Sequence, residues 1–172
     1  MGVTLIGGGV RSGKSRYALR RAEERFSAGV FVATGEARDE EMSDRILRHQ
    51  AERGSFWRTI EEPLDLVDTF KGLENQSVVV DCLTLWLSNV ILAEDHDVDV
   101  ELDRLAAVVA SPRGGELLLV TNEVGAGIVP ENPLAREFRD RAGEMNQRIA
   151  AVADEVVWMA FGCPLHVKGP KV

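Results

Sequence analysis

Residues 8–15 read Gly8-Gly9-Val10-Arg11-Ser12-Gly13-Lys14-Ser15, which is the G-x-x-x-x-G-K-S pattern of a phosphate-binding loop. Its glycines let backbone N–H groups turn inward around phosphate oxygens. Lys14 places a positive charge on the β- and γ-phosphates, and the Ser15 hydroxyl is a ligand for Mg²⁺. The stretch therefore predicts a nucleoside triphosphate site, without indicating which reaction the site serves.

The segments on either side of this loop have the context that such a site requires. Val3–Ile6 is predicted to be a short strand, and Ser15–Ala22 begins a helix whose N-terminus faces the bound anion. An ordinary glycine-rich turn is the alternative interpretation, and the flanking strand and helix argue against it.

Short apolar runs alternate with helical patterns along the rest of the chain. This alternation is typical of an α/β fold, and we expect a P-loop NTPase with a mostly parallel sheet and helices on both faces. The predicted strands are Val3–Ile6, Val30–Thr34, Val78–Asp81, Leu117–Thr121 and Val156–Phe161, with Trp57–Ile60 as a further short one. Leu165–Lys168 is predicted to form a C-terminal antiparallel edge hairpin around Gly162-Cys163-Pro164.

The predicted helices fall between these strands. Asp39 is suited to cap a helix that runs to about Arg53, and Asn132 caps the longest helix, with Pro133 at its first position. The chain contains no internal repeat, linker or low-complexity tract, so residues 1–172 are predicted to form a single domain. The remaining helices are predicted over Leu64–Leu73, Leu83–Ala93 and around Leu102–Val109.

Composition argues against several classes of function. The net charge of −8 and the lack of any long Lys/Arg block argue against an electrostatic nucleic-acid binder. No apolar run approaches a membrane span, and no signal region precedes the first strand. Cys82 and Cys163 lie among apolar residues and predict two buried thiols in a reducing compartment. We therefore expect a cytoplasmic protein with neither a nucleic-acid nor a membrane partner.

Polar residues follow three predicted strands at the ends where ligands bind in an open α/β sheet. Asp81 ends Val78–Val80 in the manner of a Walker B acid, which holds Mg²⁺ through water or positions a nucleophile. Ala33-Thr34-Gly35 either contact nucleotide or form a plain turn. Asn122 and Glu123 begin a long loop, and they either meet a second substrate or cap the turn.

Two interpretations of His49 stay open from the residues. On its predicted helix it shares a face with Met42 and Ile46, which suits a buried structural histidine. A neutral imidazole beside a triphosphate is also a competent nucleophile at phosphorus. The neighbouring Arg45 and Arg48 would bind phosphate and favour the neutral ring.

The other two histidines are predicted to be structural or solvated. His96 lies in Glu94–Asp103, which carries six acidic residues in ten. That segment is interpreted as a solvated connection in preference to a metal site. His166 lies in the terminal hairpin.

Together these residues resemble the bifunctional adenosylcobinamide kinase / adenosylcobinamide-phosphate guanylyltransferase family of cobalamin assembly. The similarity runs nearly end to end, and its most specific parts are His49 and the block from Asn122-Glu123-Val124-Gly125 to Val129-Pro130-Glu131-Asn132. The other matching motifs are the phosphate loop, Ala33-Thr34-Gly35, Asp39–Met42 with Arg45-Ile46, Trp57-Arg58-Thr59, Asp81-Cys82-Leu83-Thr84, and Phe138-Arg139-Asp140 through Asn146-Gln147-Arg148.

The resemblance implies two reactions. In the first, the terminal phosphate of ATP or GTP passes to the hydroxyl of the aminopropanol arm of adenosylcobinamide. In the second, GTP loses pyrophosphate, and its GMP passes to the enzyme and then to the phosphorylated corrinoid, giving adenosylcobinamide-GDP. In the family a histidine carries that GMP as a phosphoramidate, and His49 occupies the matching position. Some relatives have two adjacent histidines where this chain has Arg48-His49.

The resemblance also implies a RecA-like sheet, a homotrimer and a defined nucleotide site. We expect His49 and Lys14 to be catalytic, and Ser15 and Asp81 to hold Mg²⁺. Guanine selectivity needs an acceptor for N1–H and the exocyclic amine, and Glu61 is a carboxylate of that kind. Nucleotide contacts are expected at Gly8, Gly9, Val10, Arg11, Ser12, Gly13, Lys14, Ser15, Ala33, Thr34, Gly35, Gln50, Ala51, Glu52, Arg53, Glu61 and Asp81.

Two other hypotheses stay open. The chain would be a different small P-loop kinase if His49 were structural, and γ-phosphate transfer would then survive loss of the histidine. It would be a non-catalytic RecA-like module if nucleotide binding switched a partner interaction without group transfer. The long block after Thr121 and the lack of a basic patch argue against a recombinase-like role.

Overall fold

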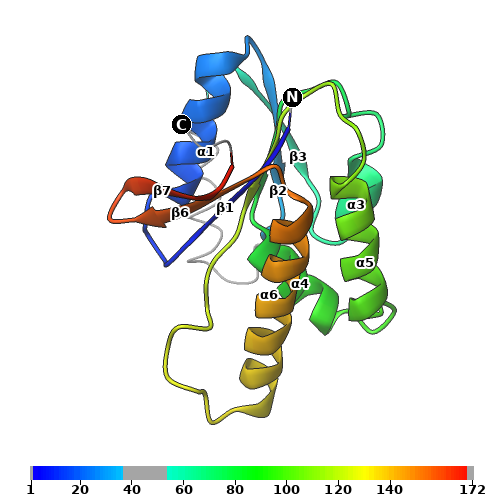
Figure 1. The fold of residues 1–172 in the computed structure, drawn as a ribbon. Helices are drawn as coiled ribbons and strands as arrows, with labels where there is room; N and C mark the ends of the chain where they lie inside the picture. Colours follow the sequence, from blue (N-terminus) through cyan, green and yellow to red (C-terminus); the bar gives the residue numbers. More distant parts are fainter. Residues whose placement is uncertain (1, 37–53, 170–172) are drawn as a thin grey trace.

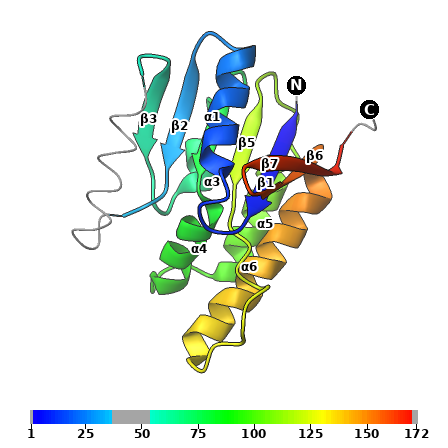
Figure 2. The same cartoon turned by 90° about the vertical axis from the view of Figure 1, so that its left-hand side faces the viewer.

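The computed structural model describes residues 2–36 and 54–169, which form a seven-stranded sheet with helices on both faces (Figures 1 and 2). The helix predicted from Asp39 to Arg53, which includes His49, lies outside the described residues. Within the described part of the chain, the predicted alternation of strands and helices is confirmed.

Six strands run parallel, and the seventh is antiparallel at one edge, in the order β3-β2-β4-β5-β1-β6-β7. The sheet has a hydrophobic core on each face, and successive side chains of a strand point to opposite faces. Leu5 therefore packs in one core and Ile6 in the other. This two-sided burial explains the continuous apolar runs in the sequence. The strands are β1 (Val3–Gly8), β2 (Gly29–Ala33), β3 (Trp57–Glu61), β4 (Val78–Asp81), β5 (Leu117–Val120), β6 (Glu155–Ala160) and β7 (Cys163–Lys168).

The helices divide unequally between the two faces (Figure 2). Helix α1 (Lys14–Arg25) covers one face, where Ala18 and Ala22 pack on inner strands. The larger core on the other face contains Trp86, which is fully buried. No helix within residues 2–36 and 54–169 combines the length and apolar character needed to cross a membrane. The helices on the second face are α3 (Leu66–Thr69), α4 (Leu83–Leu92), α5 (Val98–Val109) and α6 (Pro133–Val152).

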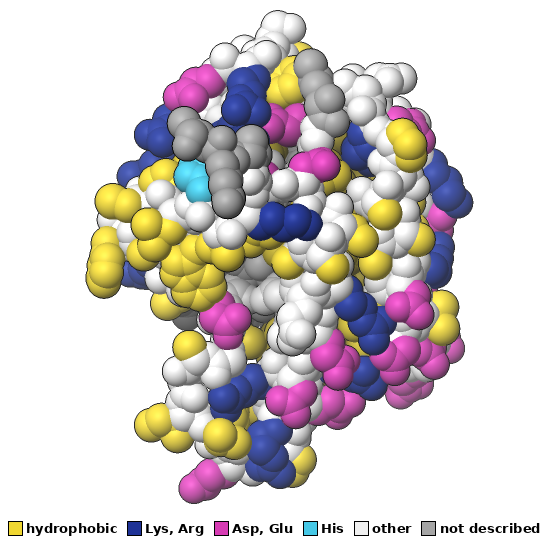
Figure 3. Space-filling view, viewed as in Figure 1, with side chains coloured by type: hydrophobic (Ala, Val, Ile, Leu, Met, Phe, Trp, Pro, Cys, Tyr) yellow, Lys and Arg dark blue, Asp and Glu magenta, His cyan; other side chains and the backbone are white. Residues whose placement is uncertain are grey.

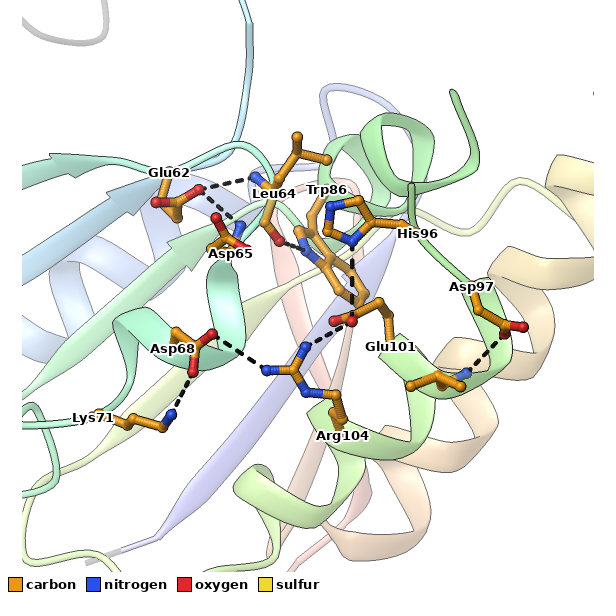
Figure 4. A network of polar contacts seen from close by, with 11 residues as sticks. Glu62, Leu64, Asp65, Asp68, Lys71, Trp86, His96, Asp97, Glu101 and Arg104 are labelled. Atoms are coloured by element: carbon orange, nitrogen blue, oxygen red, sulfur yellow. Dashed lines mark hydrogen bonds and ion pairs between the residues drawn. The ribbon is translucent and has the colours of Figure 1, made fainter. Parts of the chain in front are cut away.

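Helix α3 is shorter than the helix predicted over Leu64–Leu73. Before it, the Glu62 carboxylate accepts hydrogen bonds from the N–H groups of residues 64 and 65, so regular helix starts only afterwards (Figure 4). After Thr69, backbone hydrogen bonds span three residues instead of four, and Gly72 adopts a φ of 83°. Side chain–backbone bonds and a left-handed glycine therefore limit this helix at both ends.

Helix α3 is tied to α5 by polar contacts (Figure 4). Arg104 donates to Glu101 at 2.7 Å and to Asp68 at 3.3 Å, and Asp68 also accepts a hydrogen bond from Lys71. His96 Nδ1 lies 4.0 Å from the Glu101 carboxylate. His96 therefore borders an ion-pair network, which agrees with the structural alternative of the two roles predicted for it.

The acidic segment Glu94–Asp103 is only partly the solvated connection that was predicted. Asp97 accepts a hydrogen bond from the N–H of Val100 at 3.1 Å and caps α5, so the second half of the segment is helical. Acidic residues in the first turn favour this helix through its dipole. Across the described ranges, no group of three or more His, Cys, Asp or Glu side chains is placed to hold a metal ion.

The C-terminal antiparallel hairpin is confirmed, but its turn lies earlier than predicted. Phe161 and Gly162 have φ values of 54° and 81°, as a two-residue hairpin turn requires, and Cys163 pairs with Ala160. Pro164 therefore belongs to the edge strand, where a missing N–H is tolerated. The prediction that both thiols are buried is wrong for Cys163, which is exposed because β7 packs no face against a core, whereas Cys82 is buried.

The hairpin supports the loop that follows β1. Gly8 has a φ of 144°, and a Cβ atom placed there would lie 2.6 Å from the Met159 carbonyl oxygen of β6. The N–H of Gly162 donates to the carbonyl oxygen of Ser12 at 3.1 Å. By contrast, a Cβ atom at Gly9 would meet nothing within 4 Å.

A buried ionic network joins α1 to the opposite end of the sheet. Arg21 donates to Glu116 at 3.0 Å and lies 2.6 Å from Glu155, while Arg25 also donates to Glu116. His166 Nδ1 lies 2.8 Å from Glu155. Burial by itself would raise the pKa of the Glu155 carboxyl, but the hydrogen bond and charge of Arg21, together with His166, hold that pKa below its ordinary value.

We expect Arg21→Met to lower the free energy of unfolding by about 3 kcal/mol at neutral pH, because two buried carboxylates lose their partner. A depressed folded-state pKa stabilises the protein above the unfolded value, 4.5 for Glu155, and this contribution is lost as pH falls through the folded pKa. The difference between wild type and variant should therefore shrink in acid. Arg20→Met, at an exposed ion pair on the same helix, is the control and should change stability by less than about 0.5 kcal/mol. Equal effects in urea unfolding would contradict the assignment.

Gly8→Ala and Gly9→Ala test whether a glycine is required because of close contacts at its position or simply because it lies in the loop. We expect Gly8→Ala to cost about 1–3 kcal/mol of unfolding free energy, because the new Cβ meets a carbonyl oxygen at a left-handed φ. Gly9→Ala should stay within about 0.5 kcal/mol of wild type. Chemical denaturation without nucleotide measures both, and equal losses would show that the hairpin does not restrain Gly8.

Candidate functional site

The phosphate-binding loop joins the end of β1 to the first residue of α1. Gly13 adopts a φ of 97° at the N-cap, and its carbonyl oxygen accepts the hydrogen bond from the N–H of Tyr17 at 2.9 Å. The first turn of α1 contains no acidic residue, so the positive end of the helix dipole is not neutralised by a side chain of that turn. This geometry presents the backbone N–H groups of the first helical turn and a positive helix end to an anion.

Lys14 lies inside the loop and is 7% exposed. Its ammonium donates to the Gly9 carbonyl oxygen at 2.5 Å and to Ser12 Oγ at 3.4 Å. These neutral oxygens hold the charge at the centre of the loop, where a phosphate oxygen would be a stronger acceptor. The exposed Val10 and Arg11 form the outer rim.

Asp81 ends β4, which is not the immediate neighbour of β1. Strand β5 lies between these two strands. Val120 of β5 is in register with Ile6 on one side and with Asp81 on the other. The carboxyl ends of β1, β5 and β4 therefore lie side by side at the same end of the sheet, with β5 in the middle.

The oxygen atoms of Ser15 and Asp81 suit Mg²⁺. Ser15 lies in the first turn of α1, and Asp81 is half-buried at the end of its strand. Within residues 2–36 and 54–169, no side chain donates a hydrogen bond to the Asp81 carboxylate. A hydroxyl and an unpaired carboxylate are the hard ligands that Mg²⁺ takes together with phosphates and water.

Thr34 has a structural role in the turn after β2. Its fully buried hydroxyl donates to the Cys82 carbonyl oxygen at 2.7 Å and accepts from the Cys82 N–H at 2.8 Å. Asn89 donates to the Thr34 carbonyl oxygen at 2.9 Å. This clamp ties the end of β2 to the end of β4, next to Asp81. Contact of Ala33, Thr34 or Gly35 with a nucleotide stays a prediction.

Cys82 follows Asp81 and carries a neutral thiol. Burial, and then the charge of Asp81, raise the pKa of this thiol to about 11. It therefore serves as a small packing group and a weak acceptor, not as a nucleophile at neutral pH.

Glu61 is exposed at the end of β3, on the sheet edge opposite β7. Three strands separate β3 from β1, which corresponds to about 19 Å at the usual spacing of about 4.8 Å. The structure therefore does not bring Glu61 next to Lys14, and a guanine contact there stays a prediction. His49 and Gln50–Arg53 lie outside the described residues.

Sequence reasoning missed a set of buried hydrogen bonds beneath this edge. Thr84 of α4, Thr121 after β5 and Asn146 of α6 bond to one another and to the backbone of Asn122. We call these three side chains the Asn122 support. A weak signal was available, because Thr84 stands in a mostly apolar helix and Asn146 follows the buried Met145.

Exposed apolar residues lie on the hairpin that contacts the phosphate-binding loop and on the loop before α6. Figure 3 shows a hollow between the β6–β7 hairpin and the lobe formed by α6 and the loop before it, with hydrophobic side chains on both. The exposed apolar residues of the hairpin include Phe161 and Leu165, and those of the loop include Ile128 and Val129. This surface would suit a large, partly apolar second substrate.

Comparison with solved structures supports the fold. The flagellar accessory protein FlaH from Methanocaldococcus jannaschii is 13% identical, with a TM-score of 0.55 over 98% of this chain and 78% of its own. An ATPase from the type III secretion system of pathogenic bacteria is 11% identical, with a TM-score of 0.58 over 91% of this chain and 50% of its own. These similarities confirm the P-loop NTPase fold that the sequence predicted.

Sequence comparison identifies the family. The bifunctional adenosylcobalamin biosynthesis protein CobP of Pseudomonas aeruginosa is 42% identical over 96% of both chains. The protein CobU of Salmonella typhimurium, with the same bifunctional description, is 37% identical over 95% of this chain and 98% of its own. The family model for cobinamide kinase / cobinamide phosphate guanyltransferase matches residues 4–167. This chain, an enzyme of cobalamin biosynthesis, therefore belongs to the cobinamide kinase / cobinamide phosphate guanyltransferase family.

Proposed function

We propose that one nucleotide crevice serves both reactions of this bifunctional enzyme, with Lys14 neutralising phosphate charge in each and His49 carrying GMP in the second. The observation that carries the proposal is the buried Lys14 at the centre of a loop open to phosphate, in a chain that matches the family over residues 4–167. The substrates are ATP or GTP and adenosylcobinamide, and a homotrimer in the cytoplasm completes the proposal.

In the kinase step, the hydroxyl oxygen of the aminopropanol arm forms the new bond to the γ-phosphorus. The bond from that phosphorus to the β,γ-bridging oxygen breaks, and the nucleoside diphosphate leaves with the bonding pair. The hydroxyl proton passes to solvent. Lys14 and the N-terminus of α1 stabilise the charge on the phosphate oxygens, which is the main requirement of such a transfer.

In the transferase step, a neutral imidazole nitrogen of His49 forms a bond to the α-phosphorus of GTP, and pyrophosphate leaves. A phosphate oxygen of adenosylcobinamide phosphate then attacks that phosphorus. The N–P bond breaks, which frees the imidazole and forms the diphosphate linkage of adenosylcobinamide-GDP. Covalent catalysis thus divides one displacement into two simpler transfers.

Ser15 and Asp81 would hold Mg²⁺ in this scheme, and the metal would supply charge neutralisation on the nucleotide phosphates. This role is supported by the hydroxyl of Ser15 and by the Asp81 carboxylate, which accepts no side-chain hydrogen bond within residues 2–36 and 54–169. The exposed apolar surface on the hairpin and on the loop before α6 supports a corrinoid as the second substrate.

The covalent intermediate provides the decisive test. Incubation with Mg²⁺ and GTP labelled at the α-phosphate should give an acid-labile, base-stable label, whereas GTP labelled at the γ-phosphate should give none. His49→Ala should abolish the label, and His166→Ala, at the exposed edge strand, should retain it. Phosphorylation of adenosylcobinamide that survives in His49→Ala without any α-label in wild type would instead indicate a P-loop kinase with a structural histidine.

Lys14→Ala should lower kcat/KM of both reactions by about 10- to 100-fold, because each loses one charge-assisted contact to phosphate. Lys71→Ala is the control, since Lys71 is exposed and pairs with a surface carboxylate, and it should leave both rates unchanged. Steady-state assays of the two reactions measure the effect. A loss confined to one reaction would show that the two steps do not share the loop.

A further inference from the structure

We propose that the Asn122 carboxamide contacts the phosphoryl group that is transferred, and that Thr84, Thr121 and Asn146 hold it in place. The inference rests on the proposed function for the identity of the acceptor, but not for the contact with nucleotide. Asn122 was not among the nucleotide-binding residues expected from the sequence.

The first argument is position. Asn122 follows β5, the strand that separates the phosphate-loop strand β1 from β4 with Asp81. The N–H of the next residue, Glu123, donates to the Gly8 carbonyl oxygen at 3.1 Å, which ties this segment to the first glycine of the loop. On the other side, Asn122 Nδ2 lies 3.8 Å from Cys82 Sγ, the residue after Asp81. Asn122 is therefore held between the two segments expected to bind phosphate and Mg²⁺.

The second argument is the direction of the hydrogen bonds in the Asn122 support. The N–H of Asn122 donates to Thr84 Oγ1 at 2.7 Å, and Thr121 Oγ1 donates to Asn146 Oδ1 at 2.7 Å. The Thr121 hydroxyl has a single proton, which it donates to Asn146, so Thr84 is the donor in the 3.3 Å contact between the two hydroxyls. Asn146 Nδ2 then donates to the Asn122 carbonyl oxygen at 3.3 Å. The ring starts and ends at the backbone of Asn122.

This ring restrains one residue from three elements. Thr84 and Thr121 are 6% and 2% exposed, and every hydroxyl proton in the ring has an acceptor. Apolar residues of the same shape would satisfy packing equally well, since pairs of hydrogen-bonding groups contribute little net stability over apolar replacements. What the ring adds is orientation, because it fixes the N–H and the carbonyl oxygen of Asn122 at once.

The third argument is the side chain that this ring orients. The Asn122 carboxamide has two N–H donors, and within the described ranges its hydrogen-bond partner is the Cys82 thiol, a weak acceptor. A phosphate oxygen would be a far stronger one. The N–H and the carbonyl oxygen of Asn122 are thus both hydrogen-bonded, while its carboxamide can still donate to a ligand. This is the arrangement expected of a donor that is held in place to stabilise negative charge in the transition state.

In the kinase step, Asn122 would donate a hydrogen bond to a non-bridging oxygen of the γ-phosphate. The acceptor hydroxyl oxygen still forms the new bond to phosphorus, and the nucleoside diphosphate still leaves with the bonding pair. Asn122 neither gains nor loses a proton. Its contact should be absent with a diphosphate, and this predicts discrimination between ATP and ADP.

The test measures affinity for a non-hydrolysable ATP analogue and for ADP by calorimetry, together with the kinase rate. Asn122→Ala should weaken the triphosphate analogue and lower kcat by about 10-fold each, while ADP affinity changes by less than about twofold. Asn122→Asp keeps the shape but places a carboxylate beside phosphate, so its losses should be larger. Asn75→Ala, an exposed asparagine outside the crevice, should match wild type. Equal losses for both nucleotides, or none, would overturn the proposal.

Asn146→Ala tests the support. As a positioning residue, Asn146 should act only through Asn122, so its loss should lower kcat by about threefold in wild type and add nothing in Asn122→Ala. Additive losses in the double variant would show that Asn146 is merely structural. If the chain fails to phosphorylate adenosylcobinamide, the proposed function fails, yet the difference between the triphosphate analogue and ADP still decides the role of Asn122.

Discussion

Parallel pairing of six strands is the constraint on which the rest of this molecule depends. It brings the carboxyl ends of β1, β2, β4 and β5 to one edge, and four polar segments follow those ends. These segments contain Lys14, Thr34, Asp81 and Asn122, which are far apart in the sequence. Pairing of the strands brings them to the same end of the sheet. A phosphate-transfer site needs charge, a metal ligand and oriented donors in one place, and parallel strands supply that arrangement through the backbone.

The edge keeps its shape because its buried polar groups satisfy one another. The Thr34 hydroxyl serves both backbone groups of Cys82, and the Asn122 support serves both backbone groups of Asn122. An unpaired polar group in such a setting is costly, so each bond also specifies where its neighbours sit. Within residues 2–36 and 54–169, the Asp81 carboxylate accepts no side-chain hydrogen bond and the Asn122 carboxamide has only a weak acceptor, and the neighbouring loop contains Lys14, which donates to two neutral oxygens. The backbone groups of Cys82 and Asn122 are therefore held by hydrogen bonds beside side chains that could contact a ligand.

Several local features could not be predicted from sequence pattern. The helix expected over Leu64–Leu73 shrinks to four residues because the Glu62 carboxylate and Gly72 intervene at its ends, and periodicity does not reveal either effect. Half of the acidic segment forms α5, since a single cap at Asp97 starts a helix there. Cys163 is exposed because its strand lies at an edge, and an apolar run does not say whether its strand is central or peripheral.

By itself, the sequence determined the parallel α/β fold, the phosphate-binding loop, the Asp81 strand end and the family, because these depend on local spacing and on the burial pattern of each segment. The order of the strands was decided only in three dimensions, since pairing joins residues that no local pattern connects. That order places β5 between β1 and β4, so Asn122 lies centrally among the carboxyl ends of the strands, and it leaves three strands between β1 and the strand that ends at Glu61. The tertiary structure also decided which polar groups form hydrogen bonds within the protein and which can bind a ligand, because a hydrogen bond depends on distances that the chain acquires only when it folds.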